Sequence, residues 1–112
     1  MNIRELISNY RNEVGKGNLA PQRAAEILTE LSSIMGTILD EIQGCEMKYN
    51  KFLLKCYDSE QKANRAKIVA EISPEYEAMR TAKNTLKVVE EMIRALKYLL
   101  RSLEEGYRQA GN

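Results

Sequence analysis

The chain has 112 residues, a length typical of one domain, and seventeen Lys and Arg against sixteen Asp and Glu leave a net charge of +1. It contains no histidine, which excludes histidine general bases, Ser-His and Cys-His dyads and the usual zinc ligands. We therefore expect no enzyme activity and no cofactor. We also expect reduced thiols, because Cys45 and Cys56 are eleven positions apart in the sequence, which separates them by roughly 16 Å along one helix, beyond the reach of a disulfide.

No targeting signal stands out in the chain. The N-terminal residues lack the apolar run of a signal peptide, and no stretch approaches the ~20 apolar residues of a membrane span. We therefore expect a cytoplasmic protein that does not bind membranes.

The first two elements are helices of different length. Residues 2–14 predict a short amphipathic helix that stops at the glycine-rich cluster 15–18. A long helix from Pro21 to about residue 57 follows, because apolar side chains recur there every three or four residues. These positions are Ala24, Leu28, Leu31, Met35, Ile38, Ile42, Cys45, Tyr49, Phe52 and Cys56. We expect Gly36 and Gly44 within this helix to permit close approach of a neighbour.

The second half of the chain predicts a matching long helix. Residues 58–72 are polar and either continue the preceding helix or form a short one of their own. Ser73 is expected to cap the last helix, which has Pro74 in its first position and runs to about residue 108. Its apolar positions have the same spacing, and they are Met79, Ala82, Leu86, Val89, Ile93, Leu96, Leu100, Leu103 and Tyr107.

Two comparable seams separated by a polar connector predict an all-α fold. The simplest arrangement is a single helical domain, in which a long, coiled-coil-like antiparallel hairpin carries the short N-terminal helix. Apolar surface left over from the hairpin would be shared between chains, so we expect a homo-oligomeric helical bundle.

A row of charged residues lies one position along from the last seam, and seven of its nine members are basic. We call this row the basic stripe: Arg80, Lys83, Lys87, Glu90, Arg94, Lys97, Arg101, Glu104 and Arg108. Residues 62–101 hold nine basic residues against five acids, a net charge of +4. One interpretation is a solvated face paired with acids of the facing helix, although the acids there are scattered around the helix.

Another interpretation is binding of a phosphate-rich partner, because Arg and Lys side chains contact phosphates along nucleic acids or around nucleotides. A further one is binding to the acidic surface of a partner protein. The candidate binding residues are Arg65, Lys67, Arg80, Lys83, Lys87, Arg94, Lys97 and Arg101. Tyr76 and Tyr98 are candidates for stacking on bases, with plain packing as the alternative. The adjacent pairs Glu90-Glu91 and Glu104-Glu105 point to different helix faces, so they do not form a two-carboxylate catalytic site.

Five segments carry a family resemblance: LAPQRAAE at 19–26, LSSIMG at 31–36, ANRAKI at 63–68, SPEY at 73–76 and EMIRALKY at 91–98. They resemble small helical proteins of bacteriophages and prophages, which are often encoded near recombination and replication genes. Ala20 departs from the threonine that such proteins carry before the proline, a difference that affects only helix capping. The resemblance implies a phage origin and a bacterial host cell, and it supplies no activity.

These observations leave three functions open. The preferred one is a non-enzymatic phage accessory protein that binds nucleic acid in recombination or replication through the basic stripe. The second is an anti-defence protein, which sequesters a nucleotide signal or directly inhibits a host immune protein. The third is a structural coiled-coil scaffold, in which the stripe only keeps the helix in solution. A phage or host protein is therefore an alternative partner to nucleic acid or a nucleotide.

Overall fold

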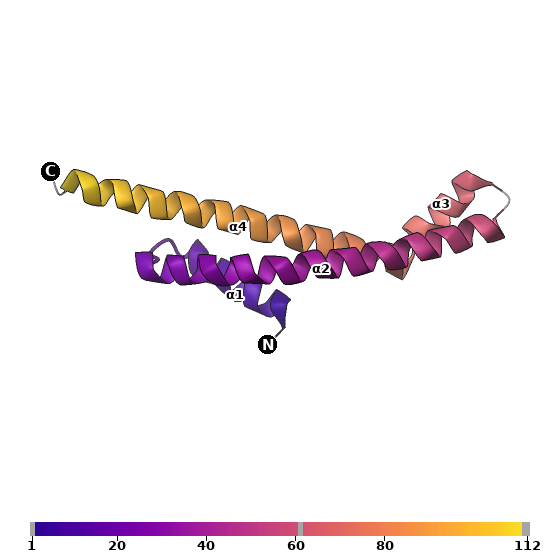
Figure 1. Cartoon of the computed structure of the whole chain (residues 1–112), viewed down its shortest axis with the longest axis horizontal. Helices are drawn as coiled ribbons and strands as arrows, with labels where there is room; N and C mark the ends of the chain where they lie inside the picture. The colour runs from indigo at the N-terminus through magenta and orange to yellow at the C-terminus, as the bar shows by residue number, and fades with distance from the viewer. Residues whose placement is uncertain (1, 61, 111–112) are drawn as a thin grey trace. The chain divides into compact units, whose positions relative to one another are not determined.

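The computed structural model describes residues 2–60 and 62–110, and these residues form four α-helices. In chain order they are α1 (Ile3–Gly15), α2 (Pro21–Ser59), α3 (Ala63–Glu71) and α4 (Pro74–Ala110), as Figure 1 shows. The predicted all-α class is confirmed, and the polar connector forms a separate helix, α3. No helix in the described part of the chain is both long enough and apolar enough to cross a membrane.

The chain forms two compact units. The first comprises Met1–Gly36 and Lys87–Asn112, and the second comprises Thr37–Leu86. The first unit therefore holds α1 with the beginning of α2 and the end of α4, and the second holds α3 with the remaining parts of both long helices. Within each unit the segments of α2 and α4 run antiparallel, as the two seams predicted (Figure 1).

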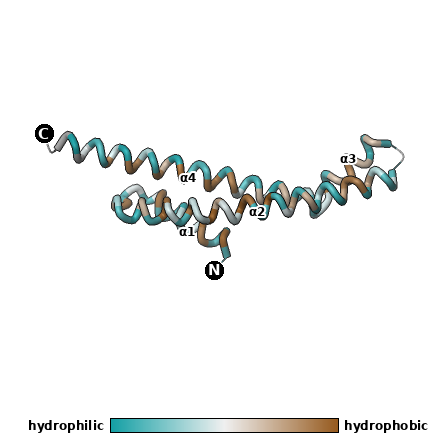
Figure 2. The backbone as a smooth tube through the Cα atoms, viewed as in Figure 1, coloured by the Kyte–Doolittle hydropathy of each residue, from teal (hydrophilic) through white to brown (hydrophobic). Residues whose placement is uncertain are grey.

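The core of the first unit is formed by one face from each of its three helices. Its buried side chains are Ile7 and Tyr10 of α1, Ala24, Ile27 and Leu31 of α2, and Val89, Met92 and Leu96 of α4. Figure 2 shows such hydrophobic positions recurring between hydrophilic ones along the helices. Burial of one large aliphatic side chain contributes about 1.5–3 kcal/mol, so this face holds the three helices together.

The second unit has a core in which small residues matter. Cys56, Ala66 and Ala70 are buried together, and Tyr49, Phe52, Leu53 and Val69 pack against them. Because an alanine side chain is a single methyl group, the two alanines let α3 lie close to α2. The sequence predicts only a polar connector here, since six of the fifteen residues 58–72 are charged; the structure shows that this segment also contributes core residues.

The apolar seams are confirmed where side chains are described. Every predicted seam position of α2, and every one of α4 up to Leu103, is buried or partly buried. The Tyr107 side chain lies outside the described part. The expectation for Gly36 and Gly44 is wrong, because a Cβ atom at either position would meet no described atom within 4 Å beyond the adjoining backbone of α2 itself. Both glycines are exposed and face away from the seam, so no helix of the described part of the chain approaches them.

Candidate functional site

The part of the basic stripe that lies in the first unit consists of exposed cations on α4. The side chains of Lys87, Arg94, Lys97 and Arg101 are all exposed. Because residues three, four or seven apart lie on the same side of a helix, these four share one face. Among the described residues, none of them takes part in an ion pair. Their charges are thus available to an anion from outside the chain.

Tyr98 lies within this group of cations. It is 72% exposed, the most open of the large aromatic side chains in the described part. It follows Arg94 by four residues and precedes Arg101 by three, so both guanidinium groups are its neighbours on the helix surface. The Tyr98 side chain makes no ring contact or hydrogen bond with any described residue. An exposed ring between two arginines suits contact with a base and its flanking phosphates.

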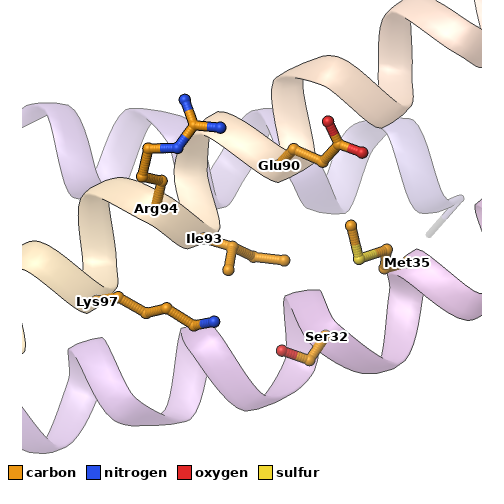
Figure 3. A pocket seen from close by; sticks show the side chains of 6 residues that line it. All are labelled: Ser32, Met35, Glu90, Ile93, Arg94 and Lys97. Carbon is orange, nitrogen blue, oxygen red and sulfur yellow. The ribbon is translucent and has the colours of Figure 1, made fainter.

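A groove of about 430 Å³ lies beside these cations, between α2 and α4 of the first unit. Its lining is Ser32 and Met35 from α2, and Glu90, Ile93, Arg94 and Lys97 from α4. Figure 3 shows Ile93 pointing from α4 toward α2, and the Lys97 side chain extending toward Ser32. The Arg94 guanidinium points away from α2. The groove therefore combines an apolar middle with a positive charge at one end.

The candidate residues of the second unit are arranged differently. Arg65, Lys67, Arg80 and Lys83 are all exposed. The Lys83 ammonium lies 3.2 Å from a Glu46 carboxylate oxygen, and the Arg65 guanidinium lies 3.5 Å from Glu60. Pairing with an acid of the facing helix, one of the interpretations of the stripe, therefore applies to Lys83.

The two candidate tyrosines belong to different units and have different surroundings. Tyr76 is partly buried in the second unit, where its ring centroid lies 5.4 Å from that of Tyr49 at an interplanar angle of 54°. Burial, followed by the charge of Glu71, raises the pKa of Tyr49. The Tyr76 ring thus contributes to packing of α4 on α2, whereas Tyr98 is open to solvent.

The α2 side of the groove was not among the predicted site residues. Met35 was assigned only to the apolar seam, and Ser32 carries no signal of its own in the sequence. Its hydroxyl donates a hydrogen bond of 2.8 Å to the Leu28 carbonyl oxygen, a common role of serine in helices. To predict that Ser32 lies opposite Lys97, one must know how α2 and α4 are aligned along their axes. The heptad spacing within each helix does not determine this alignment.

The described residues include no group of three Cys, Asp or Glu side chains that could hold a metal ion. No family model, no curated protein and no solved structure matches the chain. The resemblance to helical phage proteins therefore stays a prediction, and the functional argument depends on the α4 face alone.

Proposed function

We propose that the protein is a non-enzymatic accessory protein that binds nucleic acid through the α4 face formed by Lys87, Arg94, Lys97, Tyr98 and Arg101. We call this set the α4 cationic face. The observation that carries the proposal is that its four cations are exposed and lack ion pairs with described residues. The cations lack such ion pairs even though two acids of α4 are near them. Glu90 lies one helical turn from Arg94, and Glu91 lies one turn from Lys87. By contrast, Arg108 pairs with Glu104 at 3.3 Å farther along the same helix.

The length of the α4 cationic face favours a polymer over a single small anion. Lys87 and Arg101 are fourteen residues apart in the sequence, which spans about 21 Å of helix axis. At ~3.4 Å of axis per nucleotide of one strand, that length corresponds to roughly six phosphates. A mononucleotide would contact only part of such a row. The resemblance to phage proteins encoded near recombination and replication genes agrees with a nucleic-acid partner.

The alternatives predict different binding results. A protein that sequesters a nucleotide signal would be stabilised against thermal unfolding by a small nucleotide and would not bind DNA. A scaffold or an inhibitor of a host protein would bind neither ligand. Each of these functions is therefore an outcome of the binding experiment below.

The test is a fluorescence-anisotropy titration of labelled single- and double-stranded DNA at low and moderate salt. We expect binding that weakens with salt, because cations released from the phosphates contribute to the affinity. The variant Lys87→Glu, Arg94→Glu, Lys97→Glu and Arg101→Glu should lose binding at every salt concentration. Absence of binding by the unaltered protein at low salt would overturn the proposal.

A matched control separates the α4 cationic face from net charge. Lys48, Lys51, Lys55 and Lys62 are also exposed, and their reversal to glutamate changes the net charge by the same amount. This control variant should retain most of the affinity. Equal loss in both variants would mean that only total charge matters, and the specific surface would be wrong. Circular dichroism would verify that both variants remain helical.

We propose further that the protein self-associates through α2 of the second unit. Four large apolar side chains are exposed there: Leu39 at 50%, Met47 at 55%, Leu54 at 63% and Tyr57 at 43%. Their spacing places them, with Gln43 and Asn50 between them, within one uncharged helix face. We call it the uncharged α2 face. Exposed apolar rows of this kind commonly mark association surfaces.

A further inference from the structure

We infer that the groove between α2 and α4 of the first unit receives one unstacked nucleotide, so that the protein binds single strands in preference to duplexes. The inference rests on the proposed function and adds the class of nucleic acid. The groove volume of about 430 Å³ lies within the range of about 300–1,000 Å³ that is common for ligand sites. Met35 and Ile93, which are partly buried, provide the apolar contact that a base requires.

The charges along the groove orient such a nucleotide. The Lys97 side chain extends toward Ser32 on α2 (Figure 3), so a positively charged group lies at this end of the groove. Glu90 lines the groove as well, and its carboxylate repels a phosphate. The phosphate is therefore directed to Lys97, and the base to the apolar middle at Ile93.

The groove also shares residues with the α4 cationic face. Arg94 and Lys97 line the groove and belong to that face, so a strand that follows the cations passes the groove mouth. Tyr98, which is 72% exposed, offers a second stacking surface next to Arg94. A backbone held by the cations would thus present successive bases to Ile93 and to Tyr98.

Strand preference separates this inference from electrostatic attraction alone. A duplex carries more charge per unit length than a single strand, so a cationic row without a base site favours the duplex. A base held in the groove favours the single strand, because a paired base must first be unstacked. We therefore expect single-stranded DNA to bind about tenfold more tightly than duplex DNA of equal length, the size of one base contact.

The decisive variant is Ser32→Trp, which fills the groove without changing any charge. Ser33 provides a matched control, because it is the next residue of α2, is also exposed and does not line the groove. Ser32→Trp should lower single-strand affinity about tenfold, the size of one lost base contact, and leave duplex affinity unchanged. Ser33→Trp should retain the affinity and the strand preference of the unaltered protein.

A second pair of variants avoids the bulk of tryptophan. Ser32→Asp places a carboxylate opposite Lys97, where it should repel the phosphate, and Ser33→Asp adds the same charge outside the groove. If Ser32→Trp does not fold, the expected selective loss of single-strand affinity is measured with Ser32→Asp. Equal effects at positions 32 and 33 would overturn the groove assignment.

The outcomes also separate the inference from the proposed function. Equal affinity for single strands and duplexes, both lost in the quadruple α4 variant, would overturn the inference and keep the proposed function. Absence of any DNA binding would overturn both. A mononucleotide that raises the melting temperature of a protein unable to bind DNA would identify a free nucleotide as the ligand and overturn the strand proposal.

Discussion

At the scale of single residues, Arg23 joins α1 to α2 within the first unit. Its guanidinium Nε lies 2.6 Å from Glu13 Oε1 and its Nη2 lies 3.1 Å from Glu13 Oε2, a two-pronged contact that lysine cannot reproduce. The same group lies 3.2 Å from Glu26 and 5.8 Å from the centre of the Tyr10 ring. The hydrogen bond from Arg23 lowers the pKa of Glu13, and the hydrogen bonds to Glu13 and Glu26 raise the pKa of Arg23.

The lowered pKa of Glu13 predicts how acid affects this contact. A carboxyl group whose pKa is lower in the folded than in the unfolded state stabilises the fold at pH values above its unfolded pKa. That stabilisation is lost as the pH falls through the folded pKa. Glu13→Gln should therefore reduce the melting temperature at neutral pH, and the difference from the unaltered protein should shrink in acid.

Thermal unfolding followed by circular dichroism, from neutral pH down through the ordinary pKa range of a glutamate and below it, measures this effect, because the pKa of Glu13 is lowered from that range in the folded protein. The melting temperature of Arg23→Lys should lie between those of Arg23→Ala and the unaltered protein. Glu30→Gln serves as the control, since Glu30 is exposed and forms no ion pair with a described residue. The prediction would be contradicted if the difference in melting temperature between Glu13→Gln and the unaltered protein stayed the same in acid.

At the scale of helices, Ser73 determines where α4 begins. It is buried, its hydroxyl accepts a hydrogen bond of 3.2 Å from the Tyr76 N–H, and the same hydroxyl donates one of 2.5 Å to the Ala70 carbonyl. Ser73→Ala removes the cap of α4 and a partner of the α3 terminus. Loss of such a cap costs about 0.5–2 kcal/mol.

We expect Ser73→Ala to lower the free energy of unfolding by this amount, measured by urea denaturation. Ser33→Ala, an exposed site inside α2, should change it little. A free energy of unfolding that is equal in the two variants would show that the Ser73 contacts do not stabilise the junction between α3 and α4.

Most helix boundaries could be predicted because their signals are local. Pro21 and the Ser73-Pro74 pair mark helix starts, and the three-four apolar spacing shows which face is buried. The sequence did not decide whether residues 58–72 continue α2 or form a separate helix. The two core residues of α3, Ala66 and Ala70, lie in a run that is otherwise largely polar, so its buried face could not be recognised. The pairs that cross between long helices were missed for another reason. Lys83 with Glu46, like the groove between Ser32 and Lys97, depends on helix register, which short-range spacing leaves undetermined.

At the scale of the whole molecule, the two units differ in the surfaces they expose. The first unit exposes the α4 cationic face, and the second exposes the uncharged α2 face. The +4 charge of residues 62–101 is therefore divided between cations near Arg94 that form no ion pair with a described residue and ion-paired ones such as Lys83. A nearly neutral net charge conceals this division, which explains why composition alone carried no information about partners.

The uncharged α2 face predicts weak, reversible self-association. From Leu39 to Tyr57 it spans eighteen residues, about 27 Å of axis, and a helix is about 10 Å wide. The resulting area, on the order of 300 Å² per copy, is well below the ~800 Å² per partner of a stable complex. We therefore expect the average mass to rise with concentration, as light scattering coupled to size-exclusion chromatography would measure.

Substitutions on the two exposed apolar surfaces of the second unit decide which one associates. Met47→Lys with Leu54→Lys should leave a monomer at every concentration, because a lysine at either site would have to lose water or a counterion in the interface. Ile68 of α3 and Ile72, the residue directly after α3, are comparably exposed, at 62% and 79%. Their replacement by lysine is the control, which should still associate. Dissociation in the α3 variant alone would move the interface to α3. If the unaltered protein stays monomeric up to concentrations of about 1 mM, its affinity is too weak for self-association to matter, and the exposed apolar row then requires a different partner.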